Sequence, residues 1–131
     1  MAETENKATQ IAIAVVECDG RYLVGQRPEH VPLAGYWEFP GGKVEAGESI
    51  AAAAVRECKE EAGIEVAIAH RYPDHVHQYD HGRVQLHFFA CRVIDPASQP
   101  LPPYRWVERS ELSQLIFPAG NAKLLELLIQ S

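Results

Sequence analysis

The sequence has few cysteines and no pattern among them. Cys18, Cys58 and Cys91 are odd in number, lie far apart and form no C-x-x-C pair, which argues against a disulfide framework and a redox motif. Each of them lies among apolar residues. We therefore expect three buried free thiols in a protein of a reducing compartment.

Long apolar runs and a surplus of basic residues are also missing. No run approaches the roughly 20 apolar residues of a membrane helix, and the polar residues 1–9 lack the apolar stretch of a signal peptide. Lys and Arg number 12 against 18 Asp and Glu, for a net charge of −6, which argues against nucleic-acid polymer as the main partner. A nucleotide needs only a few local cations and a divalent metal. We expect a cytoplasmic protein without a membrane partner.

The residues that are present suit one globular domain. The chain has 131 residues, of which 47% are hydrophobic and 23% charged, and this leaves no room for two full cores. We expect a flexible polar tail over residues 1–9 and a single domain over residues 10–131.

Turn and capping residues divide the chain into short strands and two helices. Asp19-Gly20 between two apolar runs indicates a hairpin. Ser49 and Gly63 can cap a helix over residues 49–62. The other expected elements are strands at 37–39 (ended by Pro40-Gly41-Gly42), 64–69, 83–94 and 104–108, a histidine-rich strand pair over 70–82, a loop over 96–103, a helical turn capped by Ser110, and a helix over 118–130. This order indicates the α/β (α+β) class, with layers around a mixed sheet.

Three glutamates crowd onto one face of the 49–62 helix. Glu57, Glu60 and Glu61 are three and four residues apart, which places their carboxylates side by side. They also lie in the last turns, where the helix dipole disfavours anions. A Mg²⁺ ion would remove both penalties, because it prefers clustered oxygen ligands. On spacing alone, a solvated acidic face is the simpler interpretation.

The whole segment from residue 42 to residue 64 changes that balance. It follows the pattern G-x5-E-x7-R-E-U-x-E-E-x-G-U, the Nudix box, so the chain resembles the Nudix hydrolases. The fixed positions are Gly42, Glu48, Arg56, Glu57, Glu60, Glu61, Gly63 and Ile64. Cys58, at a position for an aliphatic residue, is the one departure, and a buried thiol behaves as a small hydrophobe.

The resemblance implies a Nudix α/β/α sandwich and a Mg²⁺-dependent hydrolase in which Mn²⁺ can substitute. Glu57, Glu60 and Glu61 match the metal-binding glutamates of the family, and the main chain of the Gly41-Gly42 turn commonly adds a ligand. Bound metal would neutralise phosphate oxygens and lower the pKa of the attacking water.

Two further residues of the box match an orienting pair. Arg56 resembles the family arginine that pairs with the box glutamate, here Glu48, and so orients the acidic cluster. We count both residues in the catalytic set with the three glutamates.

Beyond the box, the chain resembles the MutT-like branch, which sanitises the nucleotide pool, and its CTP-pyrophosphohydrolase relatives. The strings G-Q-R-P, G-Y-W-E-F-P-G-G-K-V-E and F-P-A-G-N carry this likeness. Arg27 matches a phosphate-holding arginine, and Asn121 matches the asparagine that reads oxidised guanine in 8-oxo-dGTP enzymes. The implied substrate-binding residues are Arg27, Glu38, Phe39, Pro40, Gly41, Arg83 and Asn121.

Two departures from the branch concern its chemistry. The loop over residues 96–103 holds no acid, although the branch usually supplies a carboxylate there, so the general base must be Glu57, Glu60, Glu61 or water. Pro32 stands where the branch has a histidine that contacts substrate.

The histidine-rich stretch has two interpretations. A transition-metal site needs a third ligand at fixed spacing, which the sequence does not offer. Surface or packing roles are therefore the favoured interpretation of His75, His77, His81 and His87.

Three functions fit these observations. The first is a MutT-type pyrophosphohydrolase that converts 8-oxo-dGTP or another modified nucleotide to the monophosphate and pyrophosphate. The second is hydrolysis of a pyrimidine triphosphate such as CTP or dCTP, or of another nucleoside diphosphate derivative. The third is a non-catalytic nucleotide-binding module, which the intact acid cluster disfavours. We expect a small nucleotide as partner and a monomer or homodimer as the assembly.

Overall fold

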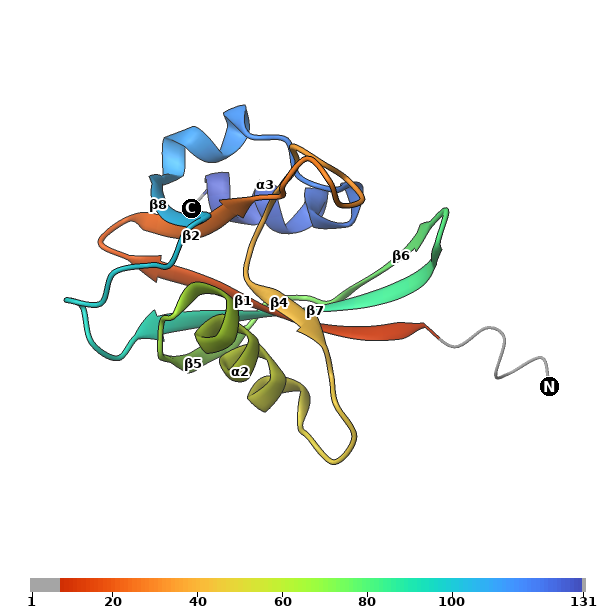
Figure 1. The fold of residues 1–131 in the computed structure, drawn as a ribbon, viewed down its shortest axis with the longest axis horizontal. Helices are drawn as coiled ribbons and strands as arrows, with labels where there is room; N and C mark the ends of the chain where they lie inside the picture. The colour runs from red at the N-terminus through yellow and green to blue at the C-terminus, as the bar shows by residue number, and fades with distance from the viewer. Residues whose placement is uncertain (1–7, 131) are drawn as a thin grey trace.

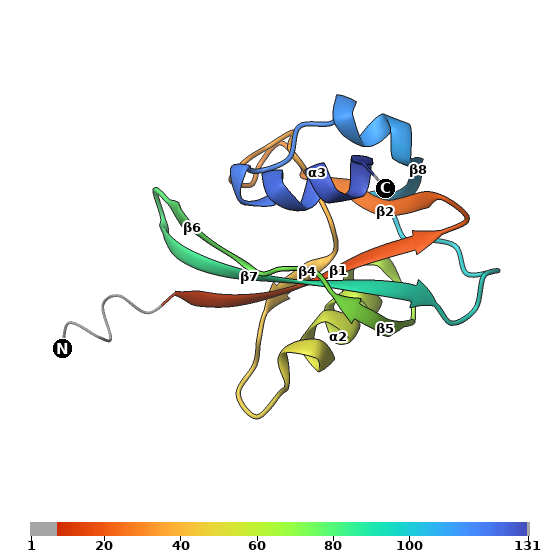
Figure 2. The same cartoon turned by 180° about the vertical axis from the view of Figure 1, so that it is seen from behind.

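A mixed sheet with helices on both faces organises the chain (Figures 1 and 2). The structure, a computed structural model, describes residues 8–130. Its elements are β1 (Thr9–Cys18), β2 (Arg21–Gln26), β3 (Trp37–Glu38), β4 (Gly41–Lys43), α2 (Ile50–Ala62), β5 (Val66–Arg71), β6 (His75–Tyr79), β7 (Gly82–Val93), β8 (Tyr104–Glu108), the 3₁₀ helices η1 (Arg109–Gln114) and η2 (Ala119–Asn121), and α3 (Ala122–Gln130). The expected mixed α+β class is confirmed. Most of the expected tail lies outside the described residues, but Thr9 already belongs to β1.

β1 is the central strand of the eight-stranded sheet. It runs parallel to β7 and antiparallel to β2 and β4. The β1–β2 turn is the predicted hairpin: Asp19 and Gly20 have φ of 53° and 78°, the left-handed pair of a type I′ turn. One expectation was wrong. The extended segment does not end at Pro40-Gly41-Gly42, because Gly41–Lys43 forms the strand β4, which pairs with β1.

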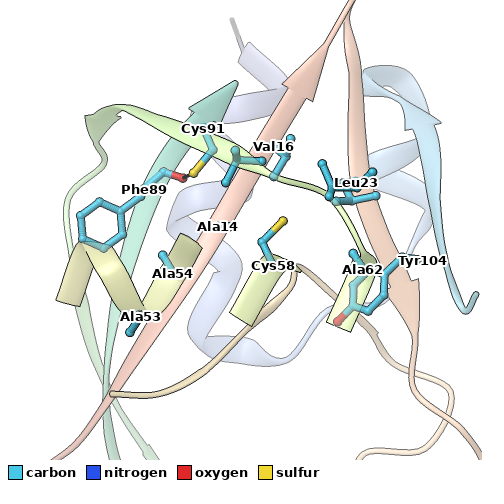
Figure 3. Close-up of a cluster of buried hydrophobic side chains, with 13 residues drawn as sticks. Ala14, Val16, Leu23, Ala53, Ala54, Cys58, Ala62, Phe89, Cys91 and Tyr104 are labelled. Carbon is cyan, nitrogen blue, oxygen red and sulfur yellow. Dashed lines mark hydrogen bonds between the residues drawn. The ribbon is translucent and has the colours of Figure 1, made fainter. Parts of the chain in front are cut away.

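The sheet carries a hydrophobic core on each face. Successive β1 residues alternate between them, so Ala14 and Val16 face α2 while Ile13 and Val15 face α3. Figure 3 shows the α2 core, in which small side chains of the helix lie against the larger ones of the sheet. The flat alanine face lets α2 pack closely, and this fixes the height of the helix above β1 and β4.

Both ends of α2 agree with the prediction. The Ser49 hydroxyl accepts a hydrogen bond from the Ala52 N–H at 3.1 Å, and Gly63 ends the helix in the left-handed conformation with φ of 70°. These two residues set the register of the helix and therefore the direction in which its glutamates point.

The C-terminal region corrects two expectations. The last helix begins at Ala122 and not at Pro118, because residues 119–121 form the tighter turn η2, in which the Asn121 N–H bonds to the Pro118 carbonyl at 3.0 Å. Glu108, and not Ser110, caps η1, through a capping box with Glu111.

Two of the three thiols are buried as predicted. Burial raises the pKa of both Cys58 and Cys91 to about 12. Cys18 is only half-buried, because it lies at the end of β1 beside the hairpin turn, so the expectation was wrong there. No helix in residues 8–130 is long and apolar enough to cross a membrane.

Candidate active site

Arg56 joins the acidic side chains of α2 to the loop that precedes the helix. Its guanidinium holds Glu48 through two bonds, Nε to Oε2 at 2.6 Å and Nη2 to Oε1 at 3.0 Å. Nη1 donates to Glu57 at 2.8 Å and to Glu60 at 3.0 Å, and Nη2 also donates to the Lys43 carbonyl at 3.2 Å. The hydrogen bonds from Arg56 hold the pKa of Glu48 below its ordinary value. The predicted orienting pair is thus a physical contact.

Glu61 lies on the other side of the cluster, against β4. Its Oε1 accepts hydrogen bonds from the Gly41 N–H at 2.9 Å and from the Tyr104 hydroxyl at 3.3 Å. Desolvation of the carboxyl group raises the pKa of Glu61 to about 7, and the charges of Glu57 and Glu38 act in the same direction. The carboxyl group is therefore poorly solvated, although the residue as a whole is exposed.

The glycine pair leaves room for these carboxylates. A Cβ on Gly42 would lie 2.5 Å from Oε2 of Glu57, so only glycine allows that carboxylate to rest on the β4 backbone. Glu57 and Glu61 therefore border the Gly41-Gly42 main chain, and this donor set of carboxylate oxygens fits a hard divalent cation.

Hydrogen bonds from Arg56, and not a close approach of the carboxylates to one another, hold this cluster together. Within residues 8–130, no three side chains of Asp, Glu, His or Cys are grouped closely enough to hold a metal ion. Glu57 and Glu60 each point an oxygen at the guanidinium. Glu57 rests against Gly42 with its other oxygen, whereas Glu60 has both oxygens near the guanidinium, at 3.0 and 3.5 Å.

A cavity of about 410 Å³ lies beside the acidic cluster, with Gly41 in its wall. Its apolar walls come from β1 and β7, through Ile11, Ile13, Val84 and Leu86. A volume of this order and an apolar wall with few polar groups are typical of a small-ligand site.

The polar side chains of this cavity come from distant parts of the chain, namely Arg27, Glu38, Tyr79, His81 and Asn121. Arg27, at the end of β2, donates from Nη1 to Glu38 at 2.8 Å and from Nε to the Pro32 carbonyl at 2.7 Å. Pro32 thus contributes its main chain where a histidine side chain was expected. Asn121 is 8% exposed, and its Nδ2 donates to the Pro118 carbonyl at 3.2 Å.

Five of the seven predicted substrate-binding residues line this cavity. They are Arg27, Glu38, Phe39, Gly41 and Asn121. Pro40 is fully buried, and its carbonyl accepts the Ala14 N–H at 2.9 Å, so it joins β4 to β1. Arg83 is exposed and lies outside the lining, because its neighbour Val84 takes the inward position on β7.

Two tyrosines were missed by sequence reasoning. Tyr104 contacts Glu61 from 43 positions further along the chain, and Tyr79 lines the cavity and accepts the Gly120 N–H at 2.8 Å. Neither tyrosine lies in a motif, and a local sequence pattern cannot predict a contact that depends on strand pairing.

The histidines have packing roles where the structure describes them. A row of ring contacts runs along β6 and the turn after it, through His75, His77, Tyr79 and His81. His87 is buried on β7, in contact with Arg71 at 2.8 Å and Gln10 at 2.6 Å, and burial lowers its pKa. None of the described histidines belongs to a group that could hold a metal.

Arg56→Ala is expected to lower kcat and metal affinity together, with a smaller effect on nucleotide binding. Without the guanidinium, Glu48 and the helix glutamates lose the group that orients them, and losses of this kind start at about tenfold. Steady-state kinetics over a Mg²⁺ titration measure both quantities. Lys59→Ala is the control, since Lys59 on the same helix pairs with Glu65 at 3.3 Å on the surface. Loss of nucleotide binding at unchanged kcat would contradict the orienting role.

The affinity for Mg²⁺ is expected to fall as the pH is lowered from 8 to 6. Below its pKa of about 7, Glu61 carries a proton in the metal-free protein, and the metal must displace that proton to bind. Calorimetry in two buffers of different ionisation enthalpy measures the released proton. In Glu61→Gln this release should disappear. Equal proton release by the wild type and this variant would assign the titration to another group.

Comparison with known proteins gives a consistent result. Residues 11–127 match the NUDIX domain family. The CTP pyrophosphohydrolase of Escherichia coli strain K12 is 42% identical over 89 residues, which are 68% of this chain and 64% of that protein. This match thus spans slightly less than two thirds of that relative. The 8-oxo-dGTP diphosphatase of Haemophilus influenzae is 32% identical over 128 residues, which are 95% of this chain and 94% of that protein.

Solved structures agree in fold and in sequence. The E. coli ORF135 protein has a TM-score of 0.74 at 33% identity, with 95% of this chain and 90% of that chain covered. MutT in a study of the Aliivibrio salmonicida and Vibrio cholerae proteins has a TM-score of 0.71 at 32% identity, with 95% and 98% covered. The family match, the relatives and the observed arrangement of the box agree, and the chain belongs to the NUDIX domain family.

Proposed function

We propose that the chain is a Mg²⁺-dependent nucleoside triphosphate pyrophosphohydrolase that acts on 8-oxo-dGTP or another modified nucleotide and releases the monophosphate and pyrophosphate. One observation carries the proposal. Gly41 belongs both to the wall of the 410 Å³ cavity and, through its N–H bond to Glu61, to the acidic cluster. A nucleoside in the cavity would therefore extend its phosphates toward the glutamates.

The metal belongs to the proposal and is supported by the family, whose hydrolases generally use divalent metals. Glu57, Glu60 and Glu61, with the main chain at Gly41-Gly42, would hold Mg²⁺, and Mn²⁺ can take its place. When bound, the metal neutralises phosphate oxygens and makes water a better nucleophile.

The other residues of the site bind, orient and carry protons. Arg27 lines the cavity and brings a positive charge to the phosphate end. Arg56 and Glu48 keep the helix carboxylates in place. One of Glu57, Glu60 and Glu61 would accept the proton of the attacking water, unless that proton passes to bulk water.

The loop over residues 96–103 does not offer a second base. Leu101 packs on the end of α2, where its N–H bonds to the Ala62 carbonyl at 2.9 Å. The loop contains no acid, so the proton must go to a carboxylate of α2 or to bulk water.

A pyrimidine triphosphate is the second candidate substrate. The 42% identity with the E. coli CTP pyrophosphohydrolase favours it, and the apolar walls of the cavity accept either kind of base. A nucleotide-binding module without catalysis is the weakest alternative, because every glutamate of the box is present. An enzyme that acts on the nucleotide pool would work in the cytoplasm, as a monomer or homodimer.

A substrate panel tests the proposal. Purified protein is incubated with 8-oxo-dGTP, dGTP, CTP and dCTP, with Mg²⁺ or with a chelator, and the products are identified as pyrophosphate or phosphate. We expect metal-dependent release of pyrophosphate and the highest kcat/KM for 8-oxo-dGTP. The highest kcat/KM for CTP or dCTP would transfer the proposal to pyrimidines. Tight nucleotide binding without turnover in Mg²⁺ would leave only the binding module.

A further inference from the structure

The tip of the β6–β7 hairpin touches the turn that carries Asn121. In both views the hairpin curves toward the α3 side of the sheet (Figures 1 and 2). Tyr79 is the last residue of β6, and its hydroxyl oxygen accepts the Gly120 N–H at 2.8 Å. Gly120 is the middle residue of η2 and the neighbour of Asn121. One hydrogen bond thus joins two walls of the cavity.

The contact is tight on both sides. A Cβ on Gly120 would lie 2.7 Å from the Tyr79 hydroxyl oxygen and 2.8 Å from Cδ1 of Leu86, so the bare backbone of η2 rests on these two side chains. The Tyr79 ring is itself held between His77, with ring centroids 4.4 Å apart, and His81, at 5.3 Å and nearly parallel. The acceptor oxygen is therefore fixed in space before any ligand arrives.

The turn η2 depends on such external support. It has three residues and no side-chain cap. Its entrance is anchored by Phe117, which stacks on Phe39 with ring centroids 5.1 Å apart, and its middle by the bond to Tyr79. Asn121 directly follows Gly120, and its side-chain Nδ2 donates a hydrogen bond to the Pro118 carbonyl. The direction of its amide therefore follows the placement of the turn.

We propose that Tyr79 is a positioning residue that determines base selectivity, because it holds η2 where Asn121 can meet the base. The inference rests on the proposed function of the cavity as the nucleobase site. The inference does not depend on which base is preferred, since a misplaced amide would form weaker hydrogen bonds with any base that it recognises.

Tyr79→Phe tests the proposal. The variant keeps the ring and its stacking on the histidines but removes the acceptor of the Gly120 N–H. The readout is the ratio of kcat/KM between the preferred nucleotide of the panel and its closest competitor, and we expect a drop of about three- to tenfold, the effect of one neutral hydrogen bond. Hydrogen exchange at the Gly120 amide, followed by NMR, should accelerate in the same variant.

Tyr72→Phe is the matched control, because Tyr72 is a half-buried tyrosine outside the cavity lining. It should leave the ratio and the Gly120 exchange rate unchanged. Gly120→Ala disturbs the same contact from the other side and should lower the ratio at least as much as Tyr79→Phe.

The outcomes separate this inference from the proposed function. Faster Gly120 exchange together with a lower ratio supports the positioning role, whichever base the wild type prefers. A ratio equal to that of the wild type or of Tyr72→Phe overturns it, even if the enzyme is a pyrophosphohydrolase. Wild type without any preference overturns it as well, because no selectivity would remain for the turn to support. The proposed function fails on the substrate panel alone.

Discussion

Glu57→Gln, Glu60→Gln and Glu61→Gln are each expected to lower kcat by about two to four orders of magnitude while the fold is kept. Glutamine keeps the size of the side chain and one carbonyl oxygen, but it loses the charge that attracts a divalent cation and accepts a proton. None of the three side chains is part of either hydrophobic core, so the thermal midpoint should remain close to that of the wild type.

The three variants should differ in their metal dependence. Glu57 and Glu60 both bond to the Arg56 guanidinium, so the loss of either should change the Mg²⁺ concentration that half-saturates kcat. Glu61 bonds to Gly41 and Tyr104 instead, and its loss should affect the pH profile most. Measurement of kcat against pH and Mg²⁺ concentration distinguishes these effects.

Glu65→Gln is the control for these substitutions. Glu65 follows α2 in the chain and pairs with Lys59 on the surface, at 3.3 Å, so its loss of charge should not change turnover. Turnover at the wild-type level in all three helix variants would refute the mechanism. Circular dichroism would detect a loss of folded protein in all three variants, and such a loss would assign the lower turnover to unfolding of the helix.

The local features of this fold could be predicted from the sequence. Ser49 and Gly63 mark the ends of α2, and Asp19-Gly20 marks the first hairpin, because each of these residues acts on its own backbone. The acidic cluster was predictable for the same reason. Its spacing along one helix places Glu57 near Glu60 whatever the rest of the chain does.

The remaining features depend on partners far along the chain. Pro40-Gly41-Gly42 was predicted to end the extended segment, but Gly41–Lys43 pairs with β1 as β4. Only glycine fits at position 41, because a Cβ there would lie 2.5 Å from the Ala12 carbonyl oxygen. The position of Arg83 could not be predicted, since a shift of one residue on a strand exchanges its two faces. Val84 takes the inward position, and the arginine faces away from the cavity.

The acidic cluster shows a similar limit. The helix spacing predicts that the carboxylates lie side by side, but not that Arg56 bonds to Glu57 and Glu60 as well as to Glu48. Arg56 also holds Glu48 through two bonds, so it ties the loop before α2 to the cluster.

Asn121→Ala is expected to lower the ratio of kcat/KM for 8-oxo-dGTP over dGTP by about 5- to 150-fold, the effect of one buried polar group left without a partner. Glutamates and phosphate-binding groups treat all triphosphates alike, so base preference must come from groups that reach the base. Oxidised guanine differs from guanine at C8 and N7, where a carbonyl and an N–H exchange acceptor for donor. An amide offers both a donor and an acceptor to that altered edge.

The position of Asn121 suits this role. It is the one buried amide in the cavity lining, 8% exposed, and its Nδ2 donates to the Pro118 carbonyl. That bond orients the amide plane, and the second hydrogen of Nδ2 and the oxygen remain to meet a base. Leucine would fill the same space without polar groups, so Asn121→Leu separates loss of recognition from loss of volume. Both variants should retain hydrolysis of dCTP near the wild-type rate, because the catalytic glutamates are untouched. If the 8-oxo-dGTP to dGTP ratio does not change in either variant, Asn121 does not read the base, and the pyrimidine interpretation gains the support that the purine one loses.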